Sequence, residues 1–331
     1  MFIWMIFVEI FNKSGTHIVL KKHHILIDPL VNHESDIVLI SHGHSDHVNI
    51  QAFKKLSQPI YLSRPTLEIL NERAKTEIKK KNIHIIKNGD RFKFNGITIQ
   101  AFNAGHCIGS LQFKIRYNQE VIIYTGDFCV ETRIGMQKGS ILKGKNAVLI
   151  TDATYSAREY DFPPRMKLYK KILKWIESVF QEQNHSTAVI FARKLGTAQE
   201  LTGLINNSTL NCELWVHPSI YYHNLIHTRY YPLGNFQYRK NLFDSSLDDF
   251  LFPKGSQCKR NKVVLLPIFM YNRKYLPQIK RVFGREAIAI CTGWALTEHF
   301  SVRSFALSSH ADYKNIQKYK IESGAKELLY F

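Results

Sequence analysis

Four side chains that can bind a metal ion fall within six consecutive residues of this chain: His42, His44, Asp46 and His47. They directly follow the apolar run 37–40, which has the composition of a buried strand. Histidine and aspartate are the ligands that Zn²⁺ takes where no thiolates are offered. The order His-x-His-x-Asp-His predicts two metal sites, one for the first two histidines and one for the Asp-His pair. A histidine-rich polar loop is the plainer alternative, and it does not explain this density.

This run resembles the signature of the metallo-β-lactamase fold, and later residues resemble its β-CASP branch, whose members cut nucleic acids. That branch includes ribonuclease J, the nuclease subunit of the eukaryotic pre-mRNA cleavage machinery with its archaeal relatives, Artemis-type DNA nucleases and ligase-associated exonucleases. The resemblance covers residues 25–331 and is weak only between 200 and 285. It implies an α/β fold, an αββα metallo-β-lactamase sandwich with an inserted α/β β-CASP cap domain.

Two residues further along match the metal motifs of this family. His106 follows an expected strand at 97–103 and lies among glycines that let the backbone turn tightly. Asp127 follows the run 122–126, and the resemblance makes its carboxylate the bridge between both metals. Such a bridging anion is needed because two divalent ions a few ångströms apart repel each other strongly.

The resemblance thus implies two bound Zn²⁺ ions, which together lower the pKa of a water and make it a nucleophile. Metal one would be held by three histidines, metal two by Asp46 and His47, and Asp127 would be shared. The three histidines are His42, His44 and His106. Oxygen and nitrogen ligands also admit Mn²⁺ or Fe.

Three more residues match family motifs. Asp28 ends the strand at 25–27, and the resemblance makes it a hydrogen-bond acceptor that orients the metal ligands. Asp152 and His310 match the acidic and histidine motifs of the β-CASP branch. The implied pair has Asp152 holding His310 while His310 protonates the leaving oxygen as general acid. Together with Asp46 they form the expected catalytic group.

One departure from the family pattern concerns the second metal. The segment 324–331 resembles the approach to a further histidine, which completes metal two in the family. The sequence stops at Phe331, about where that histidine would follow. Either the chain is trimmed or metal two is short of a ligand, and the second site is then incomplete.

The composition favours a partner of negative charge. The 331 residues carry 45 Lys and Arg against 27 Asp and Glu, a formal net charge of +18. Such a surface attracts polyanions, and Arg193 with Lys194, in a loop before an expected helix, are candidates to bind nucleic-acid phosphates. A solvated basic loop is an equal alternative for that pair.

The compartment expected from the sequence is the cytoplasm. The five cysteines are widely spaced and form no CxxC pair. Residues 1–11 are apolar, but they lack a basic leader, so we interpret them as a first strand. No stretch reaches the ~18 apolar residues of a membrane span.

Strands dominate the first half of the chain, at 17–20, 24–28, 111–117 and 121–125, with one helix expected at 66–81. After Pro163-Pro164 the pattern changes to an amphipathic helix at 165–181, followed by alternating strands and helices typical of a parallel sheet. The expected division is 1–165, first part of the metallo-β-lactamase domain, 166–299, the β-CASP cap, and 300–331, the return segment.

These features predict a zinc-dependent endo- or exonuclease that hydrolyses single-stranded nucleic acid, RNA in preference to DNA, in RNA processing such as mRNA 3′-end formation. A DNA exonuclease of the ligase-associated type is one alternative. A catalytically impaired subunit that only binds nucleic acid is another, because the last metal ligand is missing. A homodimer or a processing-complex partner is compatible with each.

Overall fold

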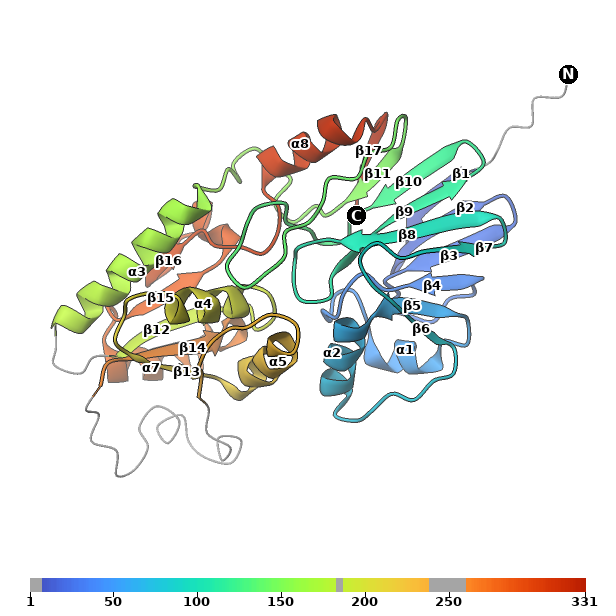
Figure 1. The fold of residues 1–331 in the computed structure, drawn as a ribbon. Coiled ribbons are helices and arrows are strands. Elements are labelled where there is room, and N and C mark those ends of the chain that lie inside the picture. The colour runs from blue at the N-terminus through green and yellow to red at the C-terminus, as the bar shows by residue number, and fades with distance from the viewer. Residues whose placement is uncertain (1–7, 183–186, 238–259) are drawn as a thin grey trace, which may run out of the picture. The chain divides into compact units, whose positions relative to one another are not determined.

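The computed structural model describes residues 8–182, 187–237 and 260–331 (Figure 1). The expected first strand therefore lies partly outside the described residues, and strand β1 spans Val8–Asn12. The chain divides into two compact units. One takes in the chain up to Thr132, Gln137–Arg158 and Ser309–Phe331; the other takes in Arg133–Met136 and Glu159–Ser308.

The first unit contains two six-stranded sheets. The first has the order β1-β2-β3-β4-β5-β6, and the second has the order β17-β11-β10-β9-β8-β7. After β1, the strands of the first sheet are β2 (Thr16–Leu20), β3 (His23–Ile27), β4 (Ile37–Leu39), β5 (Ile60–Ser63) and β6 (Ile83–Ile86). Those of the second are β7 (Arg91–Phe94), β8 (Ile97–Asn103), β9 (Leu111–Tyr117), β10 (Glu120–Tyr124), β11 (Val148–Thr151) and β17 (Glu327–Tyr330).

Alternating apolar residues join these sheets into a sandwich. Ile25 and Ile27 of β3 face a core shared with Ile99 of β8 and Phe113 of β9. The opposite side of the first sheet, which carries Leu26, packs against helices α1 (Ile50–Lys55) and α2 (Arg64–Ala74). The opposite side of the second sheet packs against helix α8 (Tyr313–Ser323). The layers are therefore helix, sheet, sheet and helix, and the predicted αββα fold class is confirmed (Figure 1).

The second unit is a five-stranded sheet in the order β13-β14-β12-β15-β16, in which all pairs are parallel. Helices α3, α4 and α5 pack on one face and α7 on the other. The strands are β12 (Thr187–Ala192), β13 (Glu213–Val216), β14 (Lys262–Pro267), β15 (Ile288–Cys291) and β16 (Arg303–Phe305). The helices are α3 (Arg165–Glu182), α4 (Thr197–Asn206), α5 (Pro218–Thr228) and α7 (Leu276–Phe283), with short 3₁₀ turns η2 (Ile268–Met270) and η3 (Gly293–Leu296).

A buried ionic group lies in the core of this second unit. The Glu200 carboxylate, which is fully buried, accepts hydrogen bonds from Arg133 Nε at 2.8 Å and from Arg165 Nη1 at 2.6 Å. The Tyr169 hydroxyl donates to the same carboxylate at 2.5 Å. The two guanidinium groups offset the cost of burying the charge of Glu200. The segment Arg133–Met136 is thereby held inside the second unit.

Two sequence predictions were wrong in their limits. The helix expected at 66–81 ends at Ala74, because Lys75 takes a left-handed conformation (φ 54°) and its amide donates to the carbonyls of Asn71 and Glu72. The segment around Phe305 was expected in the return to the sandwich, but β16 pairs with β15 in the second unit's sheet. Within the described residues, none of the helices has the length and apolar character needed to cross a membrane.

Candidate metal centre

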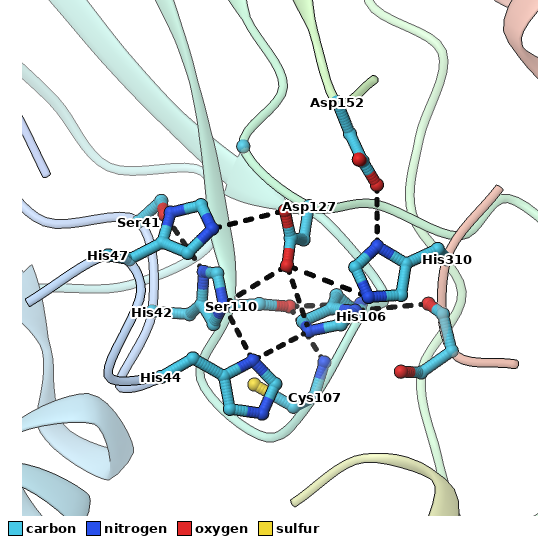
Figure 2. Close-up of polar contacts among 12 residues, drawn as sticks. Ser41, His42, His44, His47, His106, Cys107, Ser110, Asp127, Asp152 and His310 are labelled. Atoms are coloured by element: carbon cyan, nitrogen blue, oxygen red, sulfur yellow. Dashed lines mark hydrogen bonds and ion pairs between the residues drawn. The ribbon is translucent and has the colours of Figure 1, made fainter. Parts of the chain in front are cut away.

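The candidate ligands follow the ends of strands in the first unit. His42, His44 and His47 lie in the loop after β4, His106 follows β8, and Asp127 follows β10. Strands β8 and β10 each run antiparallel to β9, so their carboxyl ends lie at the same edge of the sheet. Figure 2 shows the result, with Asp127 at the centre of a ring of imidazoles.

Three histidines and one aspartate form a compact cluster. His44 Nδ1 lies 2.9 Å from His42 Nε2 and 3.1 Å from His106 Nε2. Asp127 Oδ2 lies 3.4 Å from His42 Nε2 and 3.3 Å from His106 Nε2. All four ligand atoms lie within 4.8 Å of one another. The cluster suits a divalent metal ion.

The other ring nitrogens support this assignment. His106 Nδ1 lies 3.1 Å from the backbone carbonyl of Ser309, so it must be the donor and Nε2 keeps its lone pair. Metal-binding histidines are oriented in this way in proteins. Burial lowers the pKa of His42, and it lowers that of His106 well below the usual value. Both rings are therefore held in the neutral form that binds a metal.

His47 connects the cluster to Asp28. Its Nδ1 lies 2.9 Å from Asp28 Oδ2, and its Nε2 lies 3.2 Å from Asp127 Oδ1. Burial opposes protonation of His47, but the carboxylates of Asp127 and Asp28 outweigh it and raise its pKa well above the usual value. For Asp127, burial opposes ionisation, but the surrounding imidazoles, His47 first among them, lower its pKa well below the usual value.

The structure does not bring Asp46 into these clusters. Among the described residues, the groups whose ligand atoms lie together contain His47 with Asp28 and His42, but not Asp46. Asp46 is exposed, and its negative charge partly opposes the lowering of the pKa of Arg73 by burial. The motif alone had predicted that Asp46 binds the second metal beside His47.

Asp152 and His310 lie beside the cluster and contact each other. His310 Nδ1 is 2.6 Å from Asp152 Oδ2, and both side chains are buried. The other nitrogen, His310 Nε2, lies 3.8 Å from Asp127 Oδ2, so it faces the cluster (Figure 2). These three side chains form a third group with metal-binding capacity. A buried pair of a histidine and a carboxylate thus lies next to the candidate metal ligands.

Comparison with known proteins agrees with this geometry. Residues 21–184 match the family model described as "Beta-lactamase superfamily domain". Residues 21–184 form a β-lactamase superfamily domain. This superfamily chain also resembles a solved structure of a protein of unknown function from Enterococcus faecalis V583, with a TM-score of 0.61 and 12% identity over 96% of this chain and 91% of the other. That likeness shows the fold.

Three relatives of this β-lactamase superfamily chain are named as a cleavage factor subunit or as ribonucleases. Cleavage and polyadenylation specificity factor subunit 3 of Dictyostelium discoideum is 25% identical over 56% of this chain and 27% of its own length. Endoribonuclease YSH1 of Candida glabrata is 24% identical over 66% of this chain and 33% of its own length. An RNase J-like protein of Methanocaldococcus jannaschii is 25% identical over 52% of this chain and 44% of its own length. The chain therefore spans less than half the length of these relatives.

The sequence analysis did not identify two residues that support the loop after β4, which carries His42, His44 and His47. The Arg73 guanidinium, on α2, donates to the backbone carbonyls of Gly43 (3.0 Å), His44 (3.2 Å) and Val48 (2.9 Å). The Tyr124 hydroxyl, at the end of β10, donates to Asp28 Oδ2 at 2.8 Å. Neither residue belongs to a recognisable motif. Only the packing of α2 on the first sheet and of the two sheets on each other brings them to the loop.

The Asp28 carboxylate accepts several hydrogen bonds behind the candidate ligands. Its carboxylate accepts from the Ser41 amide at 2.7 Å and the Ser41 hydroxyl at 2.5 Å, besides Tyr124 and His47. The Ser41 hydroxyl in turn lies 3.0 Å from His42 Nδ1. Asp28 therefore lies behind two of the candidate ligands, His42 and His47.

Glycine is required at one turn beside the cluster. Gly105 precedes His106 and has φ +76°, which L side chains rarely adopt. A Cβ atom there would lie 2.2 Å from the amide nitrogen of Gly139 and 2.3 Å from the carbonyl oxygen of Cys129. The tight turn expected from the glycines around His106 is present.

Arg193 and Lys194 lie in the second unit, in the loop that joins β12 to α4. Both side chains are exposed. The loop follows the carboxyl end of a parallel strand, where open α/β sheets commonly bind ligands. Burial lowers the pKa of His217 to about 4, and the positive charge of Lys194 lowers it in the same direction.

Proposed function

We propose that this chain is a metal-dependent nuclease that hydrolyses phosphodiester bonds in single-stranded nucleic acid, RNA in preference to DNA. The observation that carries the proposal is the position of the His310–Asp152 pair, with His310 Nε2 facing the cluster of His42, His44, His106 and Asp127. The relatives named as endoribonuclease and as cleavage factor support the choice of RNA.

In this proposal His42, His44, His106 and Asp127 hold the first metal ion, which we propose to be Zn²⁺. His47 and Asp127 would hold a second ion, and the exposed Asp46 would turn inward as a further ligand. Mn²⁺ or Fe fits the same oxygen and nitrogen donors. Bound divalent ions supply a nucleophilic water at neutral pH and offset the charge of the phosphate.

The chain's own residues supply the proton and the orientation. Asp152 accepts from His310 Nδ1, which fixes the ring and directs Nε2 towards the cluster. A proton held on Nε2 can be given to the leaving oxygen, and a carboxylate on the other nitrogen stabilises the protonated ring. His310 is the proposed general acid, and Asp152 is its positioning residue.

The charge of the chain agrees with a polyanionic substrate. The formal net charge of +18 favours binding to a phosphate backbone. We assign Arg193 and Lys194 to this backbone binding, because both are exposed at the end of a parallel strand. We further propose a cytoplasmic role in RNA 3′-end processing, with a second copy or a processing-complex partner, because one relative is named as a subunit of a cleavage factor.

The test compares single-stranded RNA and DNA oligonucleotides of one sequence, labelled at either end, with the zinc-loaded protein. We expect cleavage of RNA in excess of DNA, loss of cleavage in His44→Ala, and normal cleavage in His84→Gln, which changes an exposed histidine of β6. Faster cleavage of DNA would instead establish the DNA exonuclease alternative. If His44→Ala cleaves as fast as the parent protein, the assignment of the cluster as the active site is wrong.

A further inference from the structure

The carboxyl ends of the parallel strands in the second unit meet along one edge of its sheet. Strands β12 and β14 are neighbours there and pair from Thr187 with Lys262 as far as Ala192 with Pro267. The helix after β12, α4, packs on one face of the sheet, and the helix after β14, α7, packs on the other. The two loops therefore leave neighbouring strands towards opposite faces, which is the place where open α/β sheets bind ligands.

The loop after β14 exposes one large aromatic side chain. Phe269, in the turn η2, is 56% exposed, which is more than any other Phe, Tyr or Trp that the structure describes. Its apolar neighbours in the chain, Ile268, Met270 and Tyr271, instead pack against the core on the α7 face. The loop therefore buries three apolar side chains and leaves the fourth in contact with water, where a ligand can cover it.

Hydrogen bonds fix the backbone that carries this ring. The Asn272 side chain donates to the Phe269 carbonyl at 2.7 Å. It also accepts from the amides of Lys274 at 2.9 Å and Tyr275 at 3.1 Å. The Phe269 ring contacts the His217 ring, at the end of β13, with centroids 6.0 Å apart and planes at 89°. The phenyl ring is thus positioned before a ligand arrives, and an aromatic side chain with two rotatable bonds loses little entropy on binding.

Both loops are basic. The segments 193–196 and 268–275 contain no Asp or Glu, and they carry four exposed cations: Arg193, Lys194, Arg273 and Lys274. Like charges gathered at one edge of a sheet repel one another, so they favour a polyanion as ligand. A phenyl ring in the same loops adds a surface on which a nucleobase can stack. The charges and the ring together match single-stranded nucleic acid, whose phosphates and base faces are both accessible.

We propose that the loops after β12 and β14 form a subsite for single-stranded nucleic acid, in which Phe269 stacks on a base and the four cations bind the flanking phosphates. This rests on the proposed function, because it assigns part of the binding of the same substrate to the second unit. Stacking tolerates every base, since each has a π-face, so the subsite gives affinity without reading the sequence. In a duplex the base faces are covered by neighbouring base pairs, so the subsite selects unpaired strands.

The test measures binding by fluorescence anisotropy in the His44→Ala background, so that RNA stays intact. The labelled probes are a single-stranded RNA, a duplex of the same sequence and inorganic polyphosphate. We expect Phe269→Ala to weaken binding of the single strand about 5- to 150-fold, because stacking is worth about 1–3 kcal/mol per base, and to leave binding of the other two probes unchanged. Lys194→Gln combined with Arg273→Gln should weaken binding of all three probes.

Two matched variants complete this binding test. Phe269→Trp keeps a ring that can stack and should keep the affinity for single-stranded RNA. Phe11→Ala removes an exposed ring from the first unit and should not alter it. If Phe269→Ala binds single-stranded RNA as tightly as its background, the proposal is overturned, and the exposed ring belongs to another partner such as a protein. Equal weakening for RNA and polyphosphate would also overturn it, because a change of the loop would then explain the loss.

Cleavage kinetics with His44 intact separate this proposal from the proposed function. We expect Phe269→Ala to raise KM for single-stranded RNA more than it lowers kcat, because the ring binds the strand and takes no part in the reaction. Cleavage with an unchanged KM in Phe269→Ala would retain the nuclease and reject the subsite. A parent protein that binds single-stranded RNA through Phe269 but does not cleave it would reject the nuclease and retain the subsite.

Discussion

Replacing Asp28 by asparagine tests how far the polar contacts behind the ligands control metal binding. The Asp28 carboxylate accepts from the Ser41 amide (2.7 Å), the Ser41 hydroxyl (2.5 Å), His47 Nδ1 (2.9 Å) and the Tyr124 hydroxyl (2.8 Å). Three of these four bonds converge on Oδ2. Asparagine keeps the shape but replaces one oxygen by an amide group that cannot accept a hydrogen bond.

The expected loss follows from those contacts. If the amide oxygen stays with the Ser41 amide, the amide nitrogen faces three donors and His47 loses the partner that orients it. Loss of such a partner typically weakens metal binding 10- to 100-fold, or about 1.4–2.8 kcal/mol of binding free energy. We expect Asp28→Asn to lower zinc affinity by this amount while the chain stays folded.

The assay is competition for Zn²⁺ against a chelator of known affinity, with folding checked by thermal unfolding. Asp90→Asn is the matched control, because Asp90 lies in the turn before β7, where it accepts from the Lys87 amide. An Asp28→Asn zinc affinity equal to that of the control would show that Asp28 does not support zinc binding.

Three further predictions concern stability. Glu200→Gln leaves the guanidinium groups of Arg133 and Arg165 without their buried carboxylate. We therefore expect the free energy of unfolding, measured by urea denaturation, to fall by about 3–5 kcal/mol. An unchanged unfolding midpoint would show that this ionic group does not stabilise the fold. Burial lowers the pKa of His227 to about 4, whereas an unfolded histidine titrates near the usual 6.5, so its contribution is complete above pH 6.5 and is lost as pH falls from 6.5 to 4. We expect up to about 3 kcal/mol less stability at the acid end of this range, and a smaller loss in His227→Gln by denaturation at several pH values; parallel profiles for the two proteins would exclude this role. Gly105→Ala places a methyl group against two backbone atoms at a positive φ, so we expect a lower melting temperature and weaker zinc binding by calorimetry, and normal values for both would rule out the strain.

The sequence predicts local elements well where apolar runs are bounded by clear signals. The strand expected at 111–117 is confirmed at both ends, and the helix expected at 165–181 is confirmed with one added residue. The end of α2 was wrong because the left-handed conformation at Lys75 has no glycine to mark it. Helix α5 was not predicted, since its aromatic and histidine residues show no clear period.

The candidate site divides in the same way. Residues of the dense motif, such as His42 and His44, are identifiable because the residue types and their spacing are sufficient. Arg73 and Tyr124 are not, because they reach the loop from distant elements and their role depends on the packing of helix on sheet and sheet on sheet. The exposed position of Asp46 likewise depends on the path of the loop, which spacing alone does not determine.

The most direct test of the candidate metal centre is a crystal structure of the zinc-loaded protein with anomalous data collected at the zinc absorption edge. We expect an anomalous peak within about 2.0–2.2 Å of ligand atoms of His42, His44, His106 and Asp127. Anomalous peaks only elsewhere on the chain, with this cluster free of zinc at saturating concentration, would contradict it.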